Sequence, residues 1–446
     1  MDLPTAEHFD EELVDVDPEL HSAISQEYHT ERDQISLIAS ENLSSLAVRQ
    51  ALGGILTNKT VEGYPGARYL GGSAMADRIE TLAADRARAL FGSAFANVQP
   101  HSGSQMNQAV LMAVLKPGDT LLSMDTTCGG HLSHGARSNI SGQLFRIKKY
   151  GVDRATGLID YEEVRTVARK HRPKLVIAGG SSYPRSIEFA RFREIADEIE
   201  SLLLVDMSHF AGLVAAGLHP NPIPVAHVVT STTYKNLRGP RGGIILTNCS
   251  ELAREIDAAV SPGIQDSPAL HQIAAKAVCF HEALQPNFRS YAAAVLDNAR
   301  SLAEGLKERI YVVATGGTDM PFILVDLRRA RLTGDVVSAR LEAAGILVNK
   351  NQIPFDTMGP RVTSGIRLGA NAGTSRGLGP DEFHHLARLV ADLLDVLVEN
   401  PHRTIETEKG IRSQVKDLCR RFPFYASENG SHRRGSRTLT LQSCQA

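Results

Sequence analysis

The sequence predicts an α/β protein built around a mostly parallel β-sheet. Through the middle of the 446-residue chain, short apolar runs alternate with longer helical patterns, and strands separated by helices form parallel sheets that are covered on both faces. We expect a helix over residues 109–115, and strands over residues 120–124, 174–178, 202–205 and 228–230. The run from 242 to 247 predicts a further strand, at or near the antiparallel member of the sheet.

From about residue 290 the pattern changes to long helices separated by short strands. Helices are expected over residues 291–303 and 380–399, the second being the final helix, and strands over residues 322–326 and 366–369. This pattern predicts a second, smaller α+β domain. We therefore divide the chain into an N-terminal helical arm (1–48), a large domain (49–289), a small domain (290–425) and a tail (426–446). The tail is polar and rich in Gly and Ser, so we expect it to be disordered.

The amino-acid composition favours small molecules as partners. The chain has 48 basic and 50 acidic residues and a net charge of −2, which gives no electrostatic reason to expect nucleic acid or a membrane surface. The first twelve residues are acidic and lack the regions of a signal peptide, and no apolar run approaches about 18 residues, so we expect a cytoplasmic protein. Five scattered cysteines without a Cys-x-x-Cys pair argue against a disulfide framework or a structural zinc site.

One acid and one lysine follow two neighbouring expected strands. Asp206 ends an apolar strand, and Lys235 lies in the polar turn after the next one. A pyridoxal phosphate site needs a buried amine that holds the aldehyde as a Schiff base and a fixed carboxylate that faces the pyridine nitrogen. Taken alone, the lysine could be a solvated surface charge and the acid a helix cap. The residues around them decide the interpretation.

A small polar segment at residues 101–107 opens an expected helix. Ser102, Gly103 and Ser104 leave backbone N–H groups free at the positive end of that helix, where a phosphate would fit. Ser102 or Ser104 could equally be an ordinary N-cap. Together with the lysine and the acid downstream, a cofactor phosphate is the better interpretation.

Histidines, an arginine and an acid complete the candidate site. His131 and His134 could bind a metal, but no further ligand lies at the right spacing, so we expect His131 to stack on a pyridine ring and His134 to lie nearer the substrate. Arg367, in an expected strand, can bind an amino-acid carboxylate through two parallel hydrogen bonds and thereby fix the substrate's rotation; its alternative is a structural ion pair. His209 could support the cofactor or be a core histidine. Glu62 lies in a loop that glycines and Pro65 shape for close approach.

The ordered motifs of the chain resemble those of the serine hydroxymethyltransferase family. The matching segments lie at residues 37–42, 63–69, 99–105, 129–135, 205–209, 239–243, 348–351 and 363–367, together with Lys235. The resemblance covers about residues 20–425 and implies a fold-type I subunit, with a mostly parallel seven-stranded sheet and a smaller C-terminal α+β domain. It also implies a homodimer with shared active sites, possibly a tetramer. Pyridoxal phosphate and tetrahydrofolate together move a one-carbon unit between serine and glycine in that family.

The resemblance also assigns roles to individual residues. Lys235 matches the Schiff-base lysine, Asp206 the partner of the pyridine nitrogen, and Arg367 the carboxylate clamp, while Glu62 matches an acid/base carboxylate supplied by the neighbouring subunit. Ser102, Gly103 and Ser104 match the phosphate cradle. The groups that support cofactor and substrate are matched by Ser40, Ser181, His209, Thr232 and Arg241. Tyr69, Gly130 and Asn351 match folate contacts.

The departures from the family pattern lie at the site. Thr60 and Leu70 stand where the family has tyrosines, and Tyr234 where it has a histidine. Polar side chains also replace apolar residues near the folate site, at Thr126 and Ser261, and Asp266 and Ser267 replace a glycine pair in the partner's phosphate loop.

These departures change the substrate that we expect. Loss of a phenol near the substrate's α-carbon leaves space for a methyl group, and an apolar pocket discriminates one methylene by only about 1–3 kcal/mol. We therefore expect transfer between alanine and α-methylserine first, and ordinary glycine/serine turnover second. A folate-independent aldolase or threonine transaldolase is a further alternative. A non-catalytic scaffold would not need Lys235, Asp206, Glu62, His131 and Arg367 together.

Overall fold

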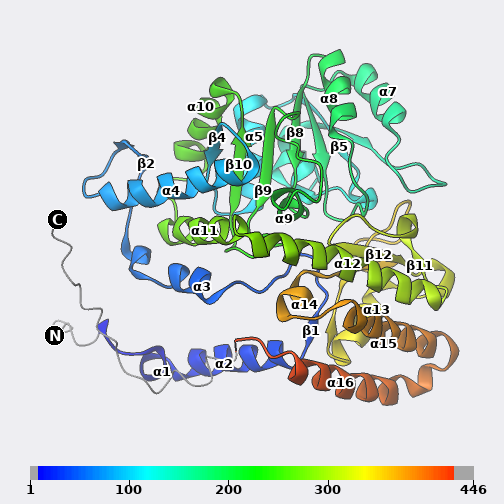
Figure 1. Cartoon of the computed structure of the whole chain (residues 1–446). Helices are drawn as coiled ribbons and strands as arrows, with labels where there is room; N and C mark the ends of the chain where they lie inside the picture. The colour runs from blue at the N-terminus through cyan, green and yellow to red at the C-terminus, as the bar shows by residue number, and fades with distance from the viewer. Residues whose placement is uncertain (1–8, 426–446) are drawn as a thin grey trace.

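The computed structural model describes residues 9–425 and places the main sheet in the upper half of the view in Figure 1. Its seven strands run in the order β4-β10-β9-β8-β7-β5-β6, and all are parallel except β10, which is antiparallel to both neighbours. Their bounds are β4 Phe95–Asn97, β5 Thr120–Met124, β6 Arg146–Tyr150, β7 Leu175–Gly179, β8 Leu202–Asp206, β9 Val228–Thr232 and β10 Gly243–Thr247.

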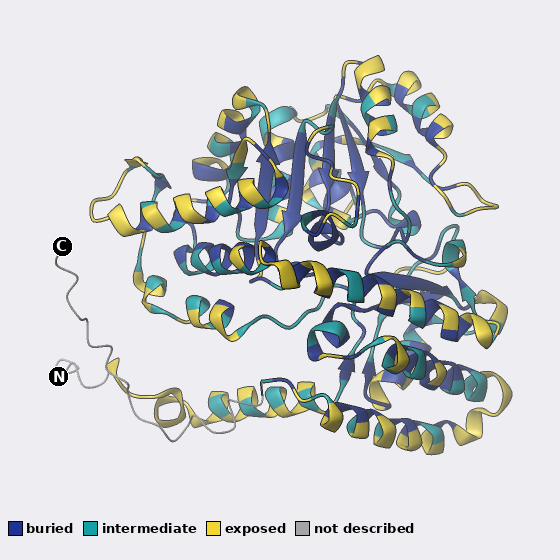
Figure 2. Ribbon diagram, viewed as in Figure 1, coloured by how far each residue is buried: buried dark blue, intermediate teal, exposed yellow. Residues whose placement is uncertain are grey.

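Helices cover both faces of this sheet, and Figure 2 shows its strands as mostly buried and the helices around them as partly exposed. Alternate residues of one strand pack into two different hydrophobic clusters: Leu203 belongs to one and Leu204 to the other. The helices of the large domain are α4 Ala74–Phe91, α5 Gly103–Val114, α6 Ile140–Leu144, α7 Tyr161–His171, α8 Phe189–Glu198, α9 Ala211–Ala215, α10 Ser250–Ala258 and α11 Leu270–Ala283.

The small domain is built on a four-stranded antiparallel sheet in the order β11-β12-β15-β14. Its strands are β11 Val312–Val313, β12 Phe322–Asp326, β14 Asn349–Asn351 and β15 Gly365–Gly369. Its helices are α13 Gly334–Ala343, α14 Asn371–Arg376, α15 Pro380–Glu399 and α16 Thr404–Arg421. The long helix α12, Pro286–Glu308, runs through the boundary that we placed at residue 289, so one continuous helix connects the two expected domains.

The N-terminal arm lies along the lower edge of the molecule, where α2 leads towards α16 (Figure 1). It contains α1 Leu13–Val16 and α2 Pro18–Arg32, neither of which has a buried residue. The arm then joins the small domain, because β1 (Ile35–Ser36) pairs in parallel with β13 (Ile346–Leu347). Helix α3, Leu46–Leu52, and a hairpin of β2 (Gly63–Tyr64) and β3 (Ala67–Arg68) connect the arm to the large domain.

The α/β class and all the strands expected from the sequence are confirmed, including the antiparallel position of the strand ending at Thr247. The expectation that the helix ending at residue 399 is the last was wrong, because α16 follows it. The strands that were not expected from the sequence are β1, β4, β6, β11, β13, β14 and the two strands of the hairpin. Four of the cysteines are free thiols; Cys444 and the tail expected to be disordered lie outside the described residues. No helix within residues 9–425 is long and apolar enough to span a membrane.

Candidate functional site

The candidate site lies at the carboxyl edge of the parallel strands, where ligands of open α/β sheets bind. Asp206 is the last residue of β8, Thr232 is the last residue of β9, and Lys235 follows three residues later. The N-terminus of α5 reaches the same edge. Together with the turn after β7 at Gly180 and Ser181, these elements enclose a cavity of about 340 Å³. The sheet topology therefore brings together residues that are far apart in the chain.

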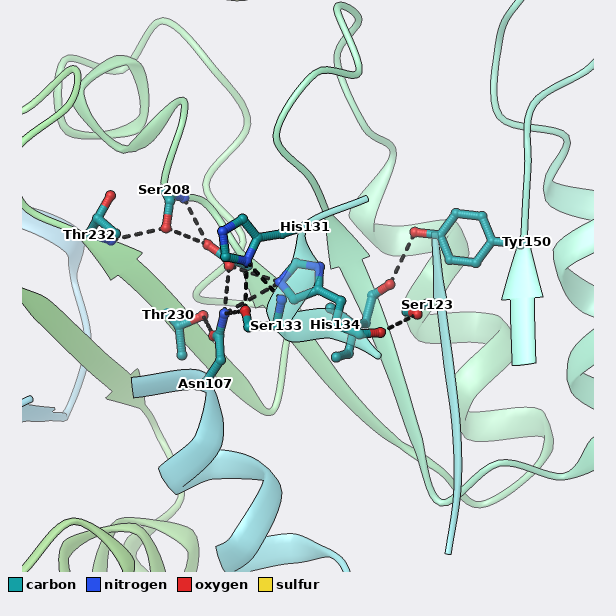
Figure 3. Close-up of polar contacts among 11 residues, drawn as sticks. Asn107, Ser123, His131, Ser133, His134, Tyr150, Ser208, Thr230 and Thr232 are labelled. Atoms are coloured by element: carbon teal, nitrogen blue, oxygen red, sulfur yellow. Dashed lines mark hydrogen bonds and ion pairs between the residues drawn. The ribbon is translucent and has the colours of Figure 1, made fainter. Parts of the chain in front are cut away.

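Asp206 is buried, and both of its carboxylate oxygens accept hydrogen bonds. Its donors Asn107, His134 and Ser208 are labelled in Figure 3. One carboxylate oxygen accepts from the amide of Asn107 and from Nε2 of His134, each at 2.9 Å. The other accepts from the backbone N–H and the hydroxyl of Ser208, at 3.1 and 2.5 Å. Burial alone would raise the pKa of Asp206, but the hydrogen bond and electrostatic interaction with His134, with the Ser208 hydroxyl, hold it well below its usual value. The site thus contains a permanent anion.

His134 does not take the position that we expected. It is 1 % exposed and lies behind Asp206 rather than on the cavity wall, so it cannot contact a substrate there. His131 does line the cavity, next to the His134 ring at 5.5 Å between centroids. Burial lowers the pKa of His131 to about 4, which leaves a neutral imidazole suited to stacking. Within residues 9–425, no group of three His, Cys, Asp or Glu side chains could hold a metal ion.

Lys235 presents a buried amine to the cavity. Its side chain is on the wall, and the residue is 5 % exposed. Burial, assisted by the charges of Arg367 and Arg241, lowers the pKa of Lys235 to about 8, while Asp206 opposes the shift. A sizeable neutral fraction at physiological pH makes this amine a nucleophile. The turn is also anchored, because Asn42 donates a hydrogen bond to the Lys235 carbonyl at 2.7 Å.

The start of α5 forms a cradle for an anion. Ser102 is the N-cap and its hydroxyl accepts from the N–H of Gln105 at 3.2 Å, so the capping role that we considered is real. The first turn still leaves N–H groups free at Gly103 and Ser104. A Cβ at Gly103 would lie 2.6 Å from the Thr232 methyl group, so only glycine lets the helix approach β9 this closely.

Two buried polar atoms on the cavity wall indicate that the site fits a polar ligand. Nδ1 of His209 and Oγ1 of Thr232 are buried and have no hydrogen-bond partner within the described chain. Burial and the neighbouring charge of Lys235 lower the pKa of His209 well below its usual value, so this ring is neutral. Orphaned buried polar atoms carry a cost unless a ligand satisfies them. An amine, an anion, a stacking ring, a cradle and two orphaned atoms are the set that pyridoxal phosphate requires.

Arg367 reaches the site from β15 of the small domain. It is buried and donates to Oδ1 of Asn349 from Nε at 3.3 Å and from Nη2 at 3.0 Å, and its Nη1 donates to the Ser181 carbonyl. It forms no ion pair with a carboxylate in residues 9–425, so the structural ion pair that we considered is absent there. Burial lowers the pKa of Arg367 to about 10. An unpaired buried guanidinium beside the cavity is suited to binding a substrate carboxylate.

The hairpin residues lie away from this cavity in the single chain. Thr60, Tyr69 and Leu70 are exposed, Tyr69 to 77 %, and Glu62 is half-buried, and none of them lines the cavity. Asp266 is exposed, and the Ser267 hydroxyl accepts from the N–H of Val61 at 3.0 Å, which places both beside the hairpin. One chain therefore does not unite this group with Lys235.

The other expected ligand contacts are divided. Ser40 lines a neighbouring cavity of about 410 Å³, which shares Tyr234 and Arg241 with the first. Asn351 donates to the hydroxyl of Ser182 at 3.2 Å, next to the cavity wall.

The expected folate residues near β5 have structural positions. Gly130 is required by packing, because a Cβ there would lie 2.1 Å from the Met124 carbonyl. Thr126 begins the turn after β5, and Ser261 is buried in the segment that follows α10.

Three residues that organise the site were not expected from the sequence. Asn107 and Ser208 bind Asp206, and Asn349 orients Arg367. Asn107 could have been found as an amide on the otherwise apolar face of α5, and Ser208 as a serine two residues after Asp206. Asn349 could have been found from strand pairing, since it lies opposite Arg367 in register.

The architecture and cavity define a fold-type I, pyridoxal phosphate-dependent enzyme. Comparison with known proteins specifies the family. The family model described as serine hydroxymethyltransferase matches residues 13–390. Enzymes named serine hydroxymethyltransferase from Rhodospirillum centenum and Paramagnetospirillum magneticum are 56 % and 54 % identical, each over 95 % of this chain and 99 % of the relative. One named serine hydroxymethyltransferase 2, from Rhodospirillum rubrum, is 52 % identical over 95 % of this chain and 98 % of the relative. The chain belongs to the serine hydroxymethyltransferase family, which uses pyridoxal phosphate and, as co-substrate, tetrahydrofolate.

Proposed function

We propose that the enzyme transfers a hydroxymethyl unit reversibly between serine and glycine, with tetrahydrofolate as the one-carbon carrier. The observation that carries this proposal is a cavity that holds the Lys235 amine, the Asp206 anion and, at its edge, the unpaired guanidinium of Arg367. The names of relatives that match nearly the whole chain support the choice of amino acids. This order differs from our expectation from sequence, which placed alanine and α-methylserine first.

The residues divide the work as follows. Bound pyridoxal phosphate supplies an electron sink conjugated to the substrate's α-carbon. Asp206 keeps a proton on the pyridine nitrogen, because its own proton is held off by its four donors. Arg367 binds the substrate carboxylate and sets which bond at the α-carbon lies perpendicular to the ring. The Lys235 amine attaches the cofactor and releases product. Glu62, from a second copy of the chain, moves the proton at the hydroxymethyl oxygen.

Alanine, giving α-methylserine, is the second candidate acceptor. The observation that favours it is the pair Thr60 and Leu70, which are both smaller than the tyrosines that the family motif places there. If these side chains face the substrate, they leave room for an α-methyl group. A folate-independent aldolase reaction is a variant of the same chemistry. Thr126 and Ser261 favour it, because they are polar where the family motif has apolar residues near the folate site.

We also propose that two copies of the chain form the working unit. Helices α1 and α2 bury no residue, yet they expose five large apolar side chains, which are Leu13, Val14, Val16, Leu20 and Ile24. An apolar arm of this kind is typical of an interface. The exposed hairpin needs a second chain if it is to take part in the reaction.

A titration of the bound cofactor separates the two acceptors. Glycine, L-alanine and D-alanine are added separately, with and without tetrahydrofolate, while the absorbance of the holoenzyme is followed. Glycine should give the largest spectral change, and the folate should increase it. A larger change with either alanine enantiomer would reverse the order of the candidates, and no change with any amino acid would indicate a non-catalytic relative.

Mixed dimers test the shared site. Lys235→Ala and Glu62→Gln chains, each inactive alone, are unfolded together and refolded as a mixture. If the hairpin acts across the interface, half of the molecules are hybrids with one intact site, and about a quarter of the wild-type activity should return. Activity that stays at the level of the separate variants would show that Glu62 acts within its own chain.

A further inference from the structure

Lys276 is a second fully buried lysine, and it lies outside the cavity. It is on α11, is 0 % exposed, and its Nζ donates to three backbone carbonyls: Val98 at 2.7 Å, Pro100 at 2.9 Å and Gly243 at 3.0 Å. An ammonium group has three N–H donors, so the three carbonyls match the protonated form. No carboxylate forms an ion pair with it anywhere in residues 9–425.

The side chain is built into the fold at close quarters. A Cβ at Gly242 would lie 2.4 Å from Cε of Lys276, so this glycine makes room for the lysine. The titratable groups facing the amine are Glu80 on α4, Cys279 on its own helix, and His101. Burial lowers the pKa of Lys276 to about 7, with the Glu80 carboxylate opposing that shift. With no ion-pair partner in residues 9–425, the buried amine depends on these three carbonyls for its compensation, which ties its position to theirs.

The carbonyls that Lys276 binds belong to the segment leading into α5. We call residues 98–101 the lead segment. Every carbonyl from 98 to 100 is held: Val98 and Pro100 by Lys276, and Gln99 by the amide of Gln265 at 3.1 Å. The third carbonyl, Gly243, lies at the start of β10, and the N–H of Gly243 donates back to Pro100 at 3.0 Å. Lys276 therefore fixes the lead segment against the sheet.

The lead segment has two functional neighbours. Its next residues, Ser102 and Gly103, open the helix whose N–H groups form the anion cradle. The side chain of Gln99 donates to the Gly63 carbonyl at 3.0 Å and to Glu80 at 2.7 Å, at the base of the hairpin that carries Glu62. We propose that Lys276 is a positioning residue, which acts through the lead segment to hold the start of α5 in the geometry that binds the cofactor phosphate.

This inference concerns the cofactor site of the family and does not depend on which amino acid is the acceptor. The test is the dissociation constant of pyridoxal phosphate from the full-length chain, measured without amino acid. Lys276→Met keeps the length of the side chain but removes the three donors. We expect it to bind the cofactor at least about tenfold more weakly, because the cradle is no longer held in place.

The matched control is Asn298→Leu, which removes a buried donor distant from the cradle. Asn298 on α12 donates to Oγ1 of Thr374 at 2.8 Å and to the Leu378 carbonyl at 3.0 Å. Both variants should lower the melting temperature of the apoprotein, but Asn298→Leu should keep the wild-type dissociation constant within about twofold. If Lys276→Met also keeps that constant while its melting temperature falls, Lys276 is only structural and the proposal is overturned.

A milder variant keeps the test valid if Lys276→Met fails to fold. Gln265→Leu removes the single donor that holds the Gln99 carbonyl. It should weaken cofactor binding in the same direction, by about threefold, as expected for loss of one neutral hydrogen bond. An unchanged dissociation constant in this variant would show that the lead segment does not control the cradle.

Discussion

The carboxyl edge of the large sheet and the β2–β3 hairpin contribute to one proposed reaction but differ in how they are built. Asp206 and Lys235 at the edge are each 5 % exposed. Both carboxylate oxygens of Asp206 accept hydrogen bonds from donors in the same chain. In the hairpin region, Tyr69 is 77 % exposed and Leu70 is 40 % exposed. The donors around Asp206 come from one chain, whereas Tyr69 and Leu70 beside the hairpin are exposed and Glu62 is half-buried.

The base of the hairpin is nevertheless rigid. Arg68 forms ion pairs with Asp77 at 2.8 Å and with Glu80 at 2.6 Å, and it also donates to the Gly63 carbonyl. Gly63 has a φ of 80°, and a Cβ there would lie 2.5 Å from the Ala67 carbonyl. A firmly held turn with exposed tips is pre-organised for contact with another molecule. The Lys235 amine and the Asp206 anion therefore meet within one chain, whereas the role proposed for the hairpin requires a second chain.

Removal of the Lys235 amine should have the largest effect on activity. Lys235→Ala should reduce turnover by about a thousandfold or more, because residues 9–425 place no other buried amine on the cavity wall. Borohydride treatment followed by mass spectrometry should show a covalent cofactor adduct in the wild-type chain and none in the variant. Lys174→Ala is the control, since Lys174 is 60 % exposed and pairs with Asp119 far from the cavity; it should keep the adduct. An adduct that persists in Lys235→Ala would refute the assignment of this lysine.

Loss of the anion should have the next largest effect. Asp206→Asn keeps the shape of the side chain but replaces one acceptor oxygen by an NH2 donor, which can face the donors Asn107 and His134. The neutral amide would also no longer keep the pyridine nitrogen protonated. We expect kcat to fall by about 100- to 1000-fold. Ser208→Ala removes one donor but leaves the charge, so it should cost about tenfold or less. Equal losses in the two variants would mean that the charge of Asp206 is not what matters.

The two regions also differ in how far the sequence predicts them. Parallel strands that end in Asp206 and precede Lys235 are visible as apolar runs with polar ends, so the edge and most of its residues were identified. The position of His134 was not, because whether a ring three residues from His131 faces the cavity or Asp206 depends on tertiary packing. Strands β4 and β6 were missed because β4 has only three residues and β6 has the polar sequence Arg-Ile-Lys-Lys-Tyr. A contact between copies would leave no periodicity in one chain, so the role proposed for the hairpin comes only from the resemblance.

Restoring the phenols tests whether the hairpin selects the substrate. Thr60→Tyr with Leu70→Tyr should lower kcat/KM for alanine relative to glycine by about 10- to 200-fold, if the hairpin closes over the substrate's α-carbon. The cofactor adduct at Lys235 should still form, because Lys235 and Asp206 on the cavity wall are unchanged. An unchanged ratio of the two kcat/KM values would show that the hairpin does not select the substrate.

The smallest expected effect is the pH dependence of cofactor attachment, which reports the burial of the edge. Because the pKa of Lys235 is lowered to about 8, the neutral amine increases about tenfold per pH unit below pH 8 and then levels off. The rate at which the apoprotein forms the covalent adduct should follow the same curve. Between about pH 8 and 10.5 the unfolded chain binds more protons at this lysine than the folded chain, so this group also makes the apoprotein more stable as pH rises through that window. A rate that continues to rise to pH 10 would mean that the amine is solvated, and the contrast between a buried edge and an exposed hairpin would then fail at its central residue.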